Sequence, residues 1–227
     1  EDVAAILDLH HDIDLLIPRG SNEFVQYIME NTNIPVMGHA DGICHVYVDA
    51  AADIDRGVRI AIDSKTQYVA VCNAAETLLV HREIAPEFLA AVAPAFGAKN
   101  VELRGDASTR EILGEQVIAA TDDDWKAEYL DYIIAIKVVD DIGSAIDHIN
   151  TFGSHHTDTI VTEDQDAAVQ FISAVDSASV VHNASTRFAD GFRYGLGAEV
   201  ALQYQIGLPE SFSKVAKHVT MVARNVG

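Results

Sequence analysis

The sequence is poor in positive charge. Its 227 residues contain 15 lysines and arginines against 35 acidic residues, so the formal net charge is −20. A surface with that excess repels nucleic acid and anionic membranes, and neither is expected as a partner. No apolar run approaches the roughly 20 residues that a membrane-spanning helix needs. The first residues also lack the basic and apolar stretches of a secretion signal.

Cysteine is scarce as well, with only Cys44 and Cys72 in the chain. Two thiols make no disulfide framework, so we expect a reducing, cytoplasmic setting. The ten histidines include adjacent pairs at 10–11 and 155–156, but neighbours in sequence rarely point at one ion. Because CxxC, HExxH and similar spacings are missing too, no metal site is expected. The sequence also lacks the glycine-rich phosphate motifs GxGxxG and the P-loop.

What the sequence does contain is a series of short, branched apolar runs that alternate with amphipathic stretches. This alternation predicts an α/β fold, with a mostly parallel sheet and helices on both faces. The predicted strands cover residues 13–17, 43–48, 77–80, 101–103, 132–139, 159–162 and 180–182. The predicted helices cover residues 22–30, 53–64, 86–96, 109–113, 142–150 and 167–175. The hydrophobic fraction of 49% is enough for one good core or two small ones.

One thiol stands at a junction between polar and apolar sequence. Cys72 follows the polar stretch Lys65–Gln67 and precedes Asn73 and the apolar strand that begins near Thr77. If Cys72 opens a helical turn, the backbone amides there would lower its pKa and donate hydrogen bonds to an oxyanion. A single cysteine is more often a small buried side chain, as Cys44 within its strand is expected to be. From the residues alone, both interpretations of Cys72 stay open.

A second group of polar residues lies in a glycine-rich loop after the predicted strand at 180–182. This loop, Asn183–Gly197, holds two arginines, two hydroxyls and an amide. Guanidinium groups bind carboxylate or phosphate through paired hydrogen bonds, so Ser185, Thr186 and Arg187 are candidates for anion binding. The alternative is an irregular loop whose arginines form ordinary salt bridges.

The sequence around these residues closely resembles that of the gamma-glutamyl phosphate reductases, a family of the aldehyde dehydrogenase superfamily. The similarity runs from about Asp14 to Val200 and covers most of the chain. The segments that carry it are Ile17–Ser21, Ile34–Gly42, Cys44–Asp49, Lys65–His81, Glu128–Tyr132, His156–Asp164 and Asn183–Val200. Hydrolytic members of the superfamily have a glutamate base in the segment that matches Met37–Ala40. This chain has no acid there, which fits a reductive reaction.

The resemblance implies an enzyme of proline biosynthesis that reduces L-glutamyl 5-phosphate to L-glutamate 5-semialdehyde, with NADPH as cofactor. Cys72 would be the catalytic nucleophile that forms a thioester, and amide groups beside it, with Asn73 as a second catalytic candidate, would stabilise the oxyanion. Ser185, Thr186 and Arg187 would border the substrate pocket. Glu128 would match the superfamily glutamate that contacts the nicotinamide ribose, although an isolated glutamate is equally well a solvated acid.

The resemblance also sets the expected domain organisation. Residues 1–36 would be a remnant of the nucleotide-binding domain, most of which has no counterpart here, residues 37–200 the catalytic domain, and residues 201–227 a divergent tail. In that tail we expect a short strand at 202–207 and an amphipathic helix at 212–222. Since the family's subunit-pairing arm comes from this region, the sequence leaves homo-oligomer formation open. Two alternatives to a working reductase also stay open: a fragment that only folds or binds a partner, and the reductase module of a bifunctional enzyme.

Overall fold

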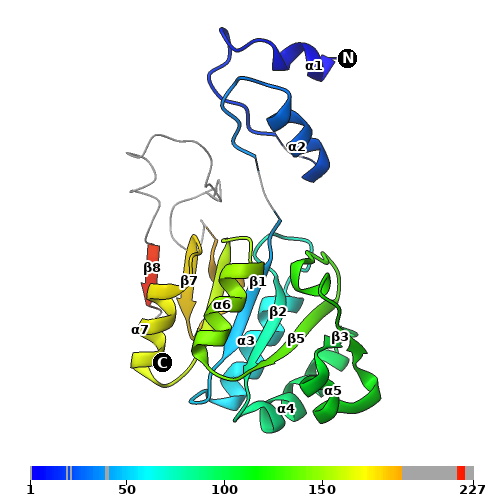
Figure 1. Cartoon of the computed structure of the whole chain (residues 1–227), viewed down its shortest axis with the longest axis vertical. Helices are drawn as coiled ribbons and strands as arrows, with labels where there is room; N and C mark the ends of the chain where they lie inside the picture. Colours follow the sequence, from blue (N-terminus) through cyan, green and yellow to red (C-terminus); the bar gives the residue numbers. More distant parts are fainter. Residues whose placement is uncertain (1, 19, 21, 39–40, 191–218, 223–227) are drawn as a thin grey trace. The chain divides into compact units, whose positions relative to one another are not determined.

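The computed structural model describes residues 2–18, 20, 22–38, 41–190 and 219–222 (Figure 1). These residues divide into two compact units, the first ending at Asp41 and the second beginning at Gly42. From the sequence we expect a domain boundary between residues 36 and 37. Each unit is described by itself below.

Among its described residues, the first unit contains two short helices, α1 (Asp2–Leu7) and α2 (Asn22–Glu30). A single parallel bridge joins Leu16 to Val36, with the Leu16 N–H donating to the Pro35 carbonyl at 2.9 Å. The predicted strand at 13–17 is therefore wrong in its extent. Pro18 and Pro35 have no N–H to donate, so a longer ladder cannot form at this point.

The second unit is built on a parallel sheet. In the described residues its strand order is β4-β3-β5-β2-β1-β6-β7-β8, and every neighbouring pair is parallel. The strands are β1 (Cys44–Val48), β2 (Ala75–His81), β3 (Glu102–Gly105), β4 (Ile118–Ala119), β5 (Ile133–Val139), β6 (Thr157–Val161), β7 (Ser179–His182) and β8 (Val219–Val222). The helices in the described part of this unit are α3 (Ile54–Thr66), α4 (Ala85–Gly97), α5 (Ala107–Leu113), α6 (Ile142–Phe152) and α7 (Gln165–Ala174). Short 3₁₀ turns cover Gly114–Gln116, Asp124–Lys126 and Thr186–Phe188.

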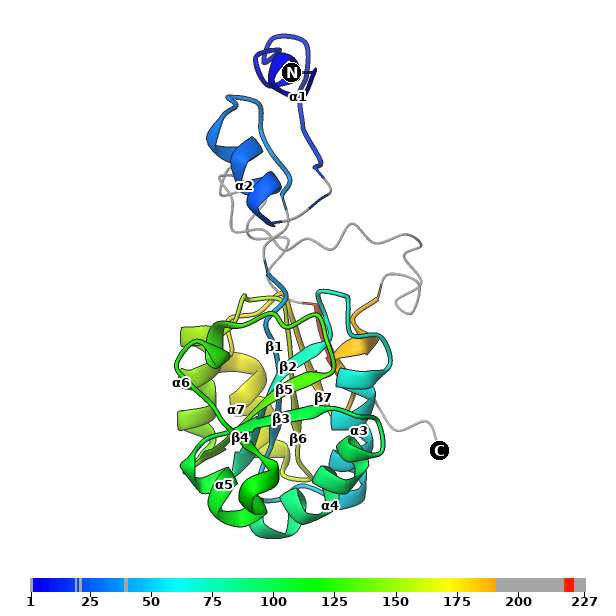
Figure 2. The same cartoon turned by 90° about the vertical axis from the view of Figure 1, so that its right-hand side faces the viewer.

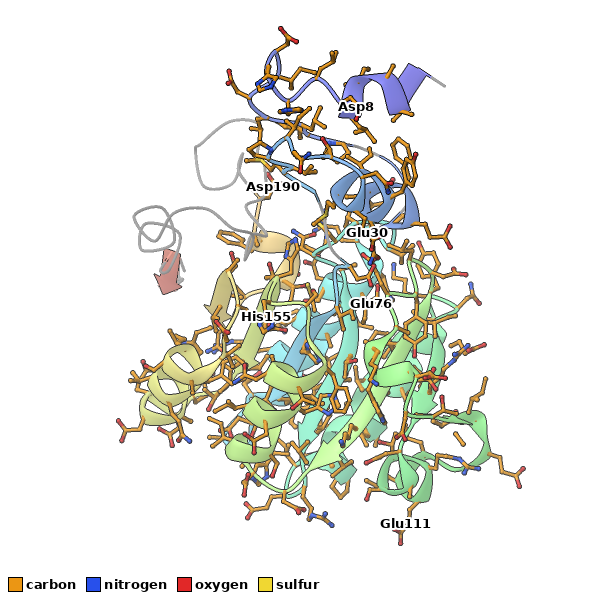
Figure 3. The ribbon with its side chains drawn as sticks, turned by 45° about the horizontal axis from the view of Figure 1, so that its top comes forward. Asp8, Glu30, Glu76, Glu111, His155 and Asp190 are labelled. Atoms are coloured by element: carbon orange, nitrogen blue, oxygen red, sulfur yellow. The ribbon has the colours of Figure 1, made fainter. Side chains whose placement is uncertain are left out.

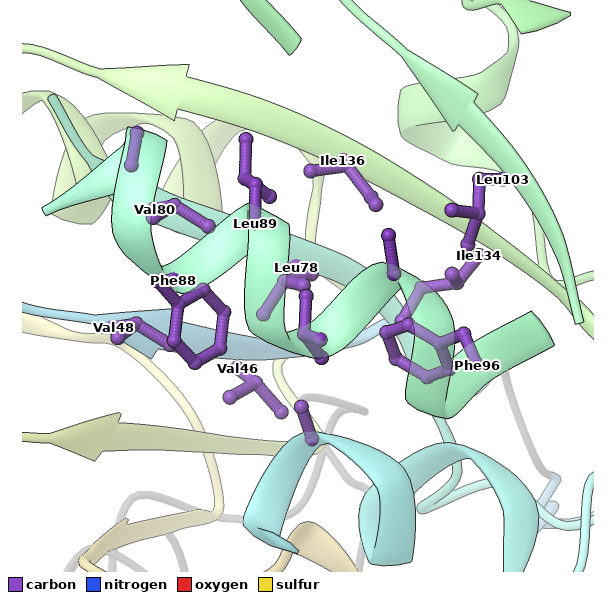
Figure 4. Close-up of a cluster of buried hydrophobic side chains, with 14 of the residues drawn as sticks. Val46, Val48, Leu78, Val80, Phe88, Leu89, Phe96, Leu103, Ile134 and Ile136 are labelled. Atoms are coloured by element: carbon purple, nitrogen blue, oxygen red, sulfur yellow. The ribbon is translucent and has the colours of Figure 1, made fainter. Parts of the chain in front are cut away.

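Helices cover both faces of this sheet (Figure 2). On one face α3 and α4 pack over the side chains of Val46, Val48 and Leu78, with Phe88 of α4 among them (Figure 4). On the other face α6 and α7 pack over Tyr47 and the strands beside it. Successive strand residues point to opposite faces, so β1 contributes to both cores and is buried throughout.

The predicted fold class is confirmed. Each predicted helix, and each predicted strand from residue 43 onward, is present with bounds that differ by a few residues. The sequence missed α1, the two-residue strand β4 and β8. The helix expected over 212–222 is wrong at 219–222, because these residues form β8 beside β7. The rest of that helix and the strand expected at 202–207 lie outside the described residues.

Candidate active site

Cys72 lies in loop 67–74, which joins α3 to β2 at the amino end of the central strands. The Ala74 N–H donates to the Val71 carbonyl at 3.0 Å, so Cys72 sits in a single hydrogen-bonded turn rather than at the start of a helix. Cys72 is partly exposed, whereas the chain is buried from Asn73 into β2. Cys72 therefore lies where partly exposed loop residues meet the buried chain that leads into β2.

The backbone of Cys72 is held by the segment that leads into β1. Gly42 lies so close that a Cβ atom placed there would be 2.0 Å from the Cys72 carbonyl oxygen and 2.4 Å from its Cα atom. Two residues further on, the Cys44 thiol donates a hydrogen bond to the same carbonyl at 3.2 Å. Burial raises the pKa of the Cys44 thiol well above its ordinary value, so this second sulfur stays protonated and unreactive.

Glu128 belongs to the same arrangement. Its Oε1 atom accepts a hydrogen bond from the Gly42 N–H at 2.9 Å, across 86 residues of sequence. Glu128 is thereby connected to Cys72 through Gly42, and it is partly buried rather than a fully solvated acid. A carboxylate accepts hydrogen bonds at both of its oxygens, so its chemistry suits a donor such as a sugar hydroxyl.

The candidate anion-binding residues form the 3₁₀ turn that follows β7. The Ser185 side chain accepts from the Arg187 N–H at 3.2 Å and caps this turn, and Thr186 is buried. Ser64 in the last turn of α3 donates to the Ser185 hydroxyl and accepts from the Thr186 N–H, both at 3.1 Å. The turn is thus fixed to the helix that leads into the Cys72 loop.

Asn73 connects the Cys72 turn to the Ser185–Arg187 turn. Its side-chain amide donates to the Ala189 carbonyl at 2.7 Å, just after the 3₁₀ turn at 186–188. The structure therefore brings the Cys72 turn and the Ser185–Arg187 turn together, with Glu128 linked through Gly42. The bond to Ala189 gives Asn73 a role in holding these two segments, alongside the catalytic role predicted for it.

Sequence reasoning missed a buried ion pair at this site. Lys65 Nζ lies 2.5 Å from Glu76 Oε2, and both side chains have 0% exposure. Burial raises the pKa of Glu76 to about 7, against the lowering effect of the Lys65 ammonium, and burial lowers the pKa of Lys65. The sequence shows Lys65 only as part of a polar approach to Cys72, because nothing local indicates that a lysine at the end of an amphipathic helix is buried.

In the part of the chain that the structure describes, no group of three or more histidine, cysteine, aspartate or glutamate side chains is arranged to hold a metal ion. In the same residues, none of the helices combines the length and the apolar character needed to cross a membrane.

Comparisons with known proteins identify what this chain is similar to. The model of the aldehyde dehydrogenase family matches residues 1–112. A gamma-glutamyl phosphate reductase from Cyanothece sp. is 60% identical over 202 residues, which is 89% of this chain and 46% of that protein. The enzyme of the same name from Natronomonas pharaonis is 59% identical over 202 residues, with 89% and 46% covered. The chain spans about half the length of the curated relatives it matches.

Solved structures agree. The crystal structure of gamma-glutamyl phosphate reductase from Thermotoga maritima matches with a TM-score of 0.85 and 44% identity, covering 88% of this chain and 48% of that one. A propionaldehyde dehydrogenase from Clostridium phytofermentans matches with a TM-score of 0.66 over 91% of this chain and 55% of its own. At 19% identity the second match shows the fold alone.

Proposed function

We propose, from the premise that this chain is homologous to the gamma-glutamyl phosphate reductases of the aldehyde dehydrogenase family, that it is the nucleophile-bearing part of such an enzyme. The reaction would be the NADPH-dependent reduction of L-glutamyl 5-phosphate to L-glutamate 5-semialdehyde and phosphate, in proline biosynthesis. The observation that carries the proposal is the position of Cys72, a partly exposed residue on a turn whose backbone is fixed by Gly42 and Cys44.

Cys72 would attack the acyl carbon of the substrate as the thiolate. A carbon–sulfur bond forms, the bond from the acyl carbon to the phosphate oxygen breaks, and phosphate leaves with the electron pair. A bound reduced nicotinamide supplies the hydride for reduction of the Cys72 thioester. The resulting tetrahedral oxyanion on Cys72 would then break its carbon–sulfur bond, which would release the semialdehyde and return Cys72 to the thiolate that began the reaction.

Ser185, Thr186 and Arg187 would hold the anionic part of the substrate next to Cys72. Hydroxyl groups and a guanidinium bind phosphate or carboxylate oxygens with charge-assisted hydrogen bonds, and Ser64 fixes the turn that presents them. In a protein of net charge −20 such a local cationic group offsets the surrounding field. Glu128 would hold the nicotinamide ribose, as the resemblance to the family implies, because a carboxylate is suited to accept hydrogen bonds from sugar hydroxyls.

The proposal includes a reducing, cytoplasmic setting, in which the Cys72 thiol is protected from oxidation. Two alternatives to this function are possible results of the test. In one, these residues fold and bind a partner, such as a second copy of the chain, without catalysis. In the other, they are the reductase module of a bifunctional enzyme.

The test is a titration of this chain with NADPH, followed by the fluorescence of the cofactor, with iodoacetamide labelling of Cys72 in the same samples. Saturable binding that changes the labelling rate of Cys72 is expected if cofactor and thiol share a site. Absence of binding, with Cys72 labelling at the rate of a free cysteine, would overturn the proposal for this chain and favour the non-catalytic alternative.

A further inference from the structure

A buried ion pair joins the two ends of the loop that carries Cys72. Lys65 is in the last turn of α3 and Glu76 is the second residue of β2, so the pair closes loop 67–74 at its base. In Figure 3, Glu76 lies near one end of the sheet, and Glu111 of α5 lies near the other end. Buried ion pairs are costly to desolvate, and apolar residues of similar size often stabilise a fold as well or better. Stability alone therefore gives little reason for charges at this position.

The pair has further partners in the segment at 128–131. The Glu76 carboxylate accepts a backbone hydrogen bond from Leu130, which acts with Lys65 to lower the pKa of Glu76 against the effect of burial. The Lys65 ammonium lies 5.8 Å from the centre of the Tyr129 ring. The charged groups that act on the pair are Glu128, which raises the pKa of Glu76, and Asp131, which raises that of Lys65. The pair thus interacts with residues 128–131 as well as with the loop that it closes.

A chain of contacts leads from the pair to Cys72. Tyr129, beside Lys65, is anchored by its hydroxyl, which donates to Asp124 Oδ1 at 2.8 Å. The residue before it, Glu128, accepts from the Gly42 N–H, and Gly42 is in contact with the Cys72 backbone. Cys44, whose thiol donates to the Cys72 carbonyl, is within electrostatic reach of both Glu76 and Lys65.

We propose that Lys65 and Glu76 are positioning residues for the Cys72 nucleophile. The pair fixes the base of loop 67–74 and, through the segment at 128–129 and Gly42, sets the geometry in which the Cys72 thiol meets an acyl group. This inference rests on the proposed function for its chemistry, because a nucleophile must have an electrophile to meet. Neither residue touches the substrate in this account.

The test replaces the pair by apolar side chains of similar length, Lys65→Met with Glu76→Met, which avoids an unpaired buried charge. Two rates are measured. The first is acylation of Cys72 by L-glutamyl 5-phosphate, generated in place from glutamate and ATP by a glutamate kinase and followed by intact mass. The second is alkylation of Cys72 by iodoacetamide between pH 6 and 10. A cooperative thermal transition shows that the variant is folded. The control is Arg82→Gln with Asp140→Asn, which removes an exposed ion pair after β2 and β5.

We expect the Met/Met variant to fold, to be acylated at least about tenfold more slowly than the unchanged chain, and to show a shifted pH midpoint of alkylation, because small misplacement of a reacting group lowers rates strongly. The control should match the unchanged chain in both rates. If the Met/Met variant is unfolded, the Glu76→Gln variant takes its place. This change keeps the side-chain volume and one acceptor for Lys65, and the same two rates then test the inference.

A folded variant with acylation within a factor of two of the unchanged chain and the same alkylation profile would overturn the inference. Failure of the proposed function is visible separately, as absence of acylation in the unchanged chain. In that case the alkylation profile still decides whether the pair positions the thiol.

Discussion

Gly42 is the residue that shows most directly how sequence and site are coupled. There is no room for a Cβ atom, because Cys72 backbone atoms occupy its position at 2.0–2.5 Å. Backbone cannot move aside as the end of a flexible side chain does, so Gly42→Ala must shift the Cys72 turn. We expect this variant to lose acylation of Cys72 by at least about tenfold, since the nucleophile is displaced. Intact mass after reaction with L-glutamyl 5-phosphate measures the effect.

Gly97→Ala is the matched control for that change. Gly97 ends α4, and a Cβ atom there would have no atom within 4 Å. Acylation should be unchanged, and stability should be equal or slightly higher, because alanine is less flexible than glycine in the unfolded chain. Normal acylation of the Gly42→Ala protein would show that the close contact with Cys72 has no bearing on reactivity.

Asp124 gives a residue-scale prediction of pH dependence. Burial acts to raise its pKa, but hydrogen bonds from Arg104, Thr121 and Tyr129 prevail and lower it to about 2. A carboxyl whose folded-state pKa is depressed stabilises the fold above its unfolded pKa, near 3.8, and loses that stabilisation as the pH falls toward 2. The shift corresponds to roughly 2 kcal/mol of unfolding free energy at neutral pH.

Asp124→Asn should therefore lower the free energy of unfolding by about 2 kcal/mol at pH 7, with the difference vanishing near pH 2. Urea unfolding at a series of pH values measures both. The adjacent Asp123→Asn is the control, because Asp123 is exposed and its side chain caps nothing. An equal loss in the two variants, or a loss that does not depend on pH, would contradict the role given to Asp124.

At the scale of elements, the acidic residues are more than a solvated coat. In the second unit the side chains of Asp53, Asp106, Asp141 and Asp164 accept hydrogen bonds from backbone N–H groups at the starts of α3, α5, α6 and α7. An aspartate at this position satisfies free N–H groups and interacts favourably with the helix dipole. Part of the large negative charge is thus needed to begin the helices.

The cap of α3 is the one that bears on the site, because Ser64 and Lys65 lie at the other end of that helix. Asp53 Oδ1 accepts from the Arg56 N–H at 2.7 Å. Asp53→Ala should lower the free energy of unfolding by about 1 kcal/mol, measured by urea unfolding at pH 7. Asp55→Ala, an exposed first-turn acid on the same helix, should cost less. Equal costs would show that charge, rather than the cap bond, is what matters at this helix start.

At the scale of the whole molecule, the sequence predicts the architecture well and the site in part. Local periodicity was sufficient for the strands and helices, because each buried run such as β1 packs by its own side chains. The bridge at Leu16 and strand β8, which comes last in the described strand order, were mispredicted, since their pairing depends on partners distant in the chain.

The residues of the candidate site were likewise predicted from the sequence only in part. Cys72 and the Ser185–Arg187 turn are recognisable from local residue types and from the resemblance. The contacts that fix them are not: Gly42 on Cys72, Asn73 on Ala189 and Lys65 on Glu76 all form in three dimensions. Burial of a lysine is especially hard to foresee, because such residues are mostly exposed.

The measurement that tests the account most directly is the intact mass of the chain after reaction with L-glutamyl 5-phosphate, without NADPH, followed by treatment with hydroxylamine. We expect one glutamyl group on Cys72, released by hydroxylamine as a thioester is. The group should be missing in Cys72→Ser and retained in Cys44→Ser, whose hydroxyl can still donate to the Cys72 carbonyl. Absence of an adduct on the unchanged chain, or an adduct of equal size in Cys72→Ser, would contradict the assignment of Cys72 as the nucleophile.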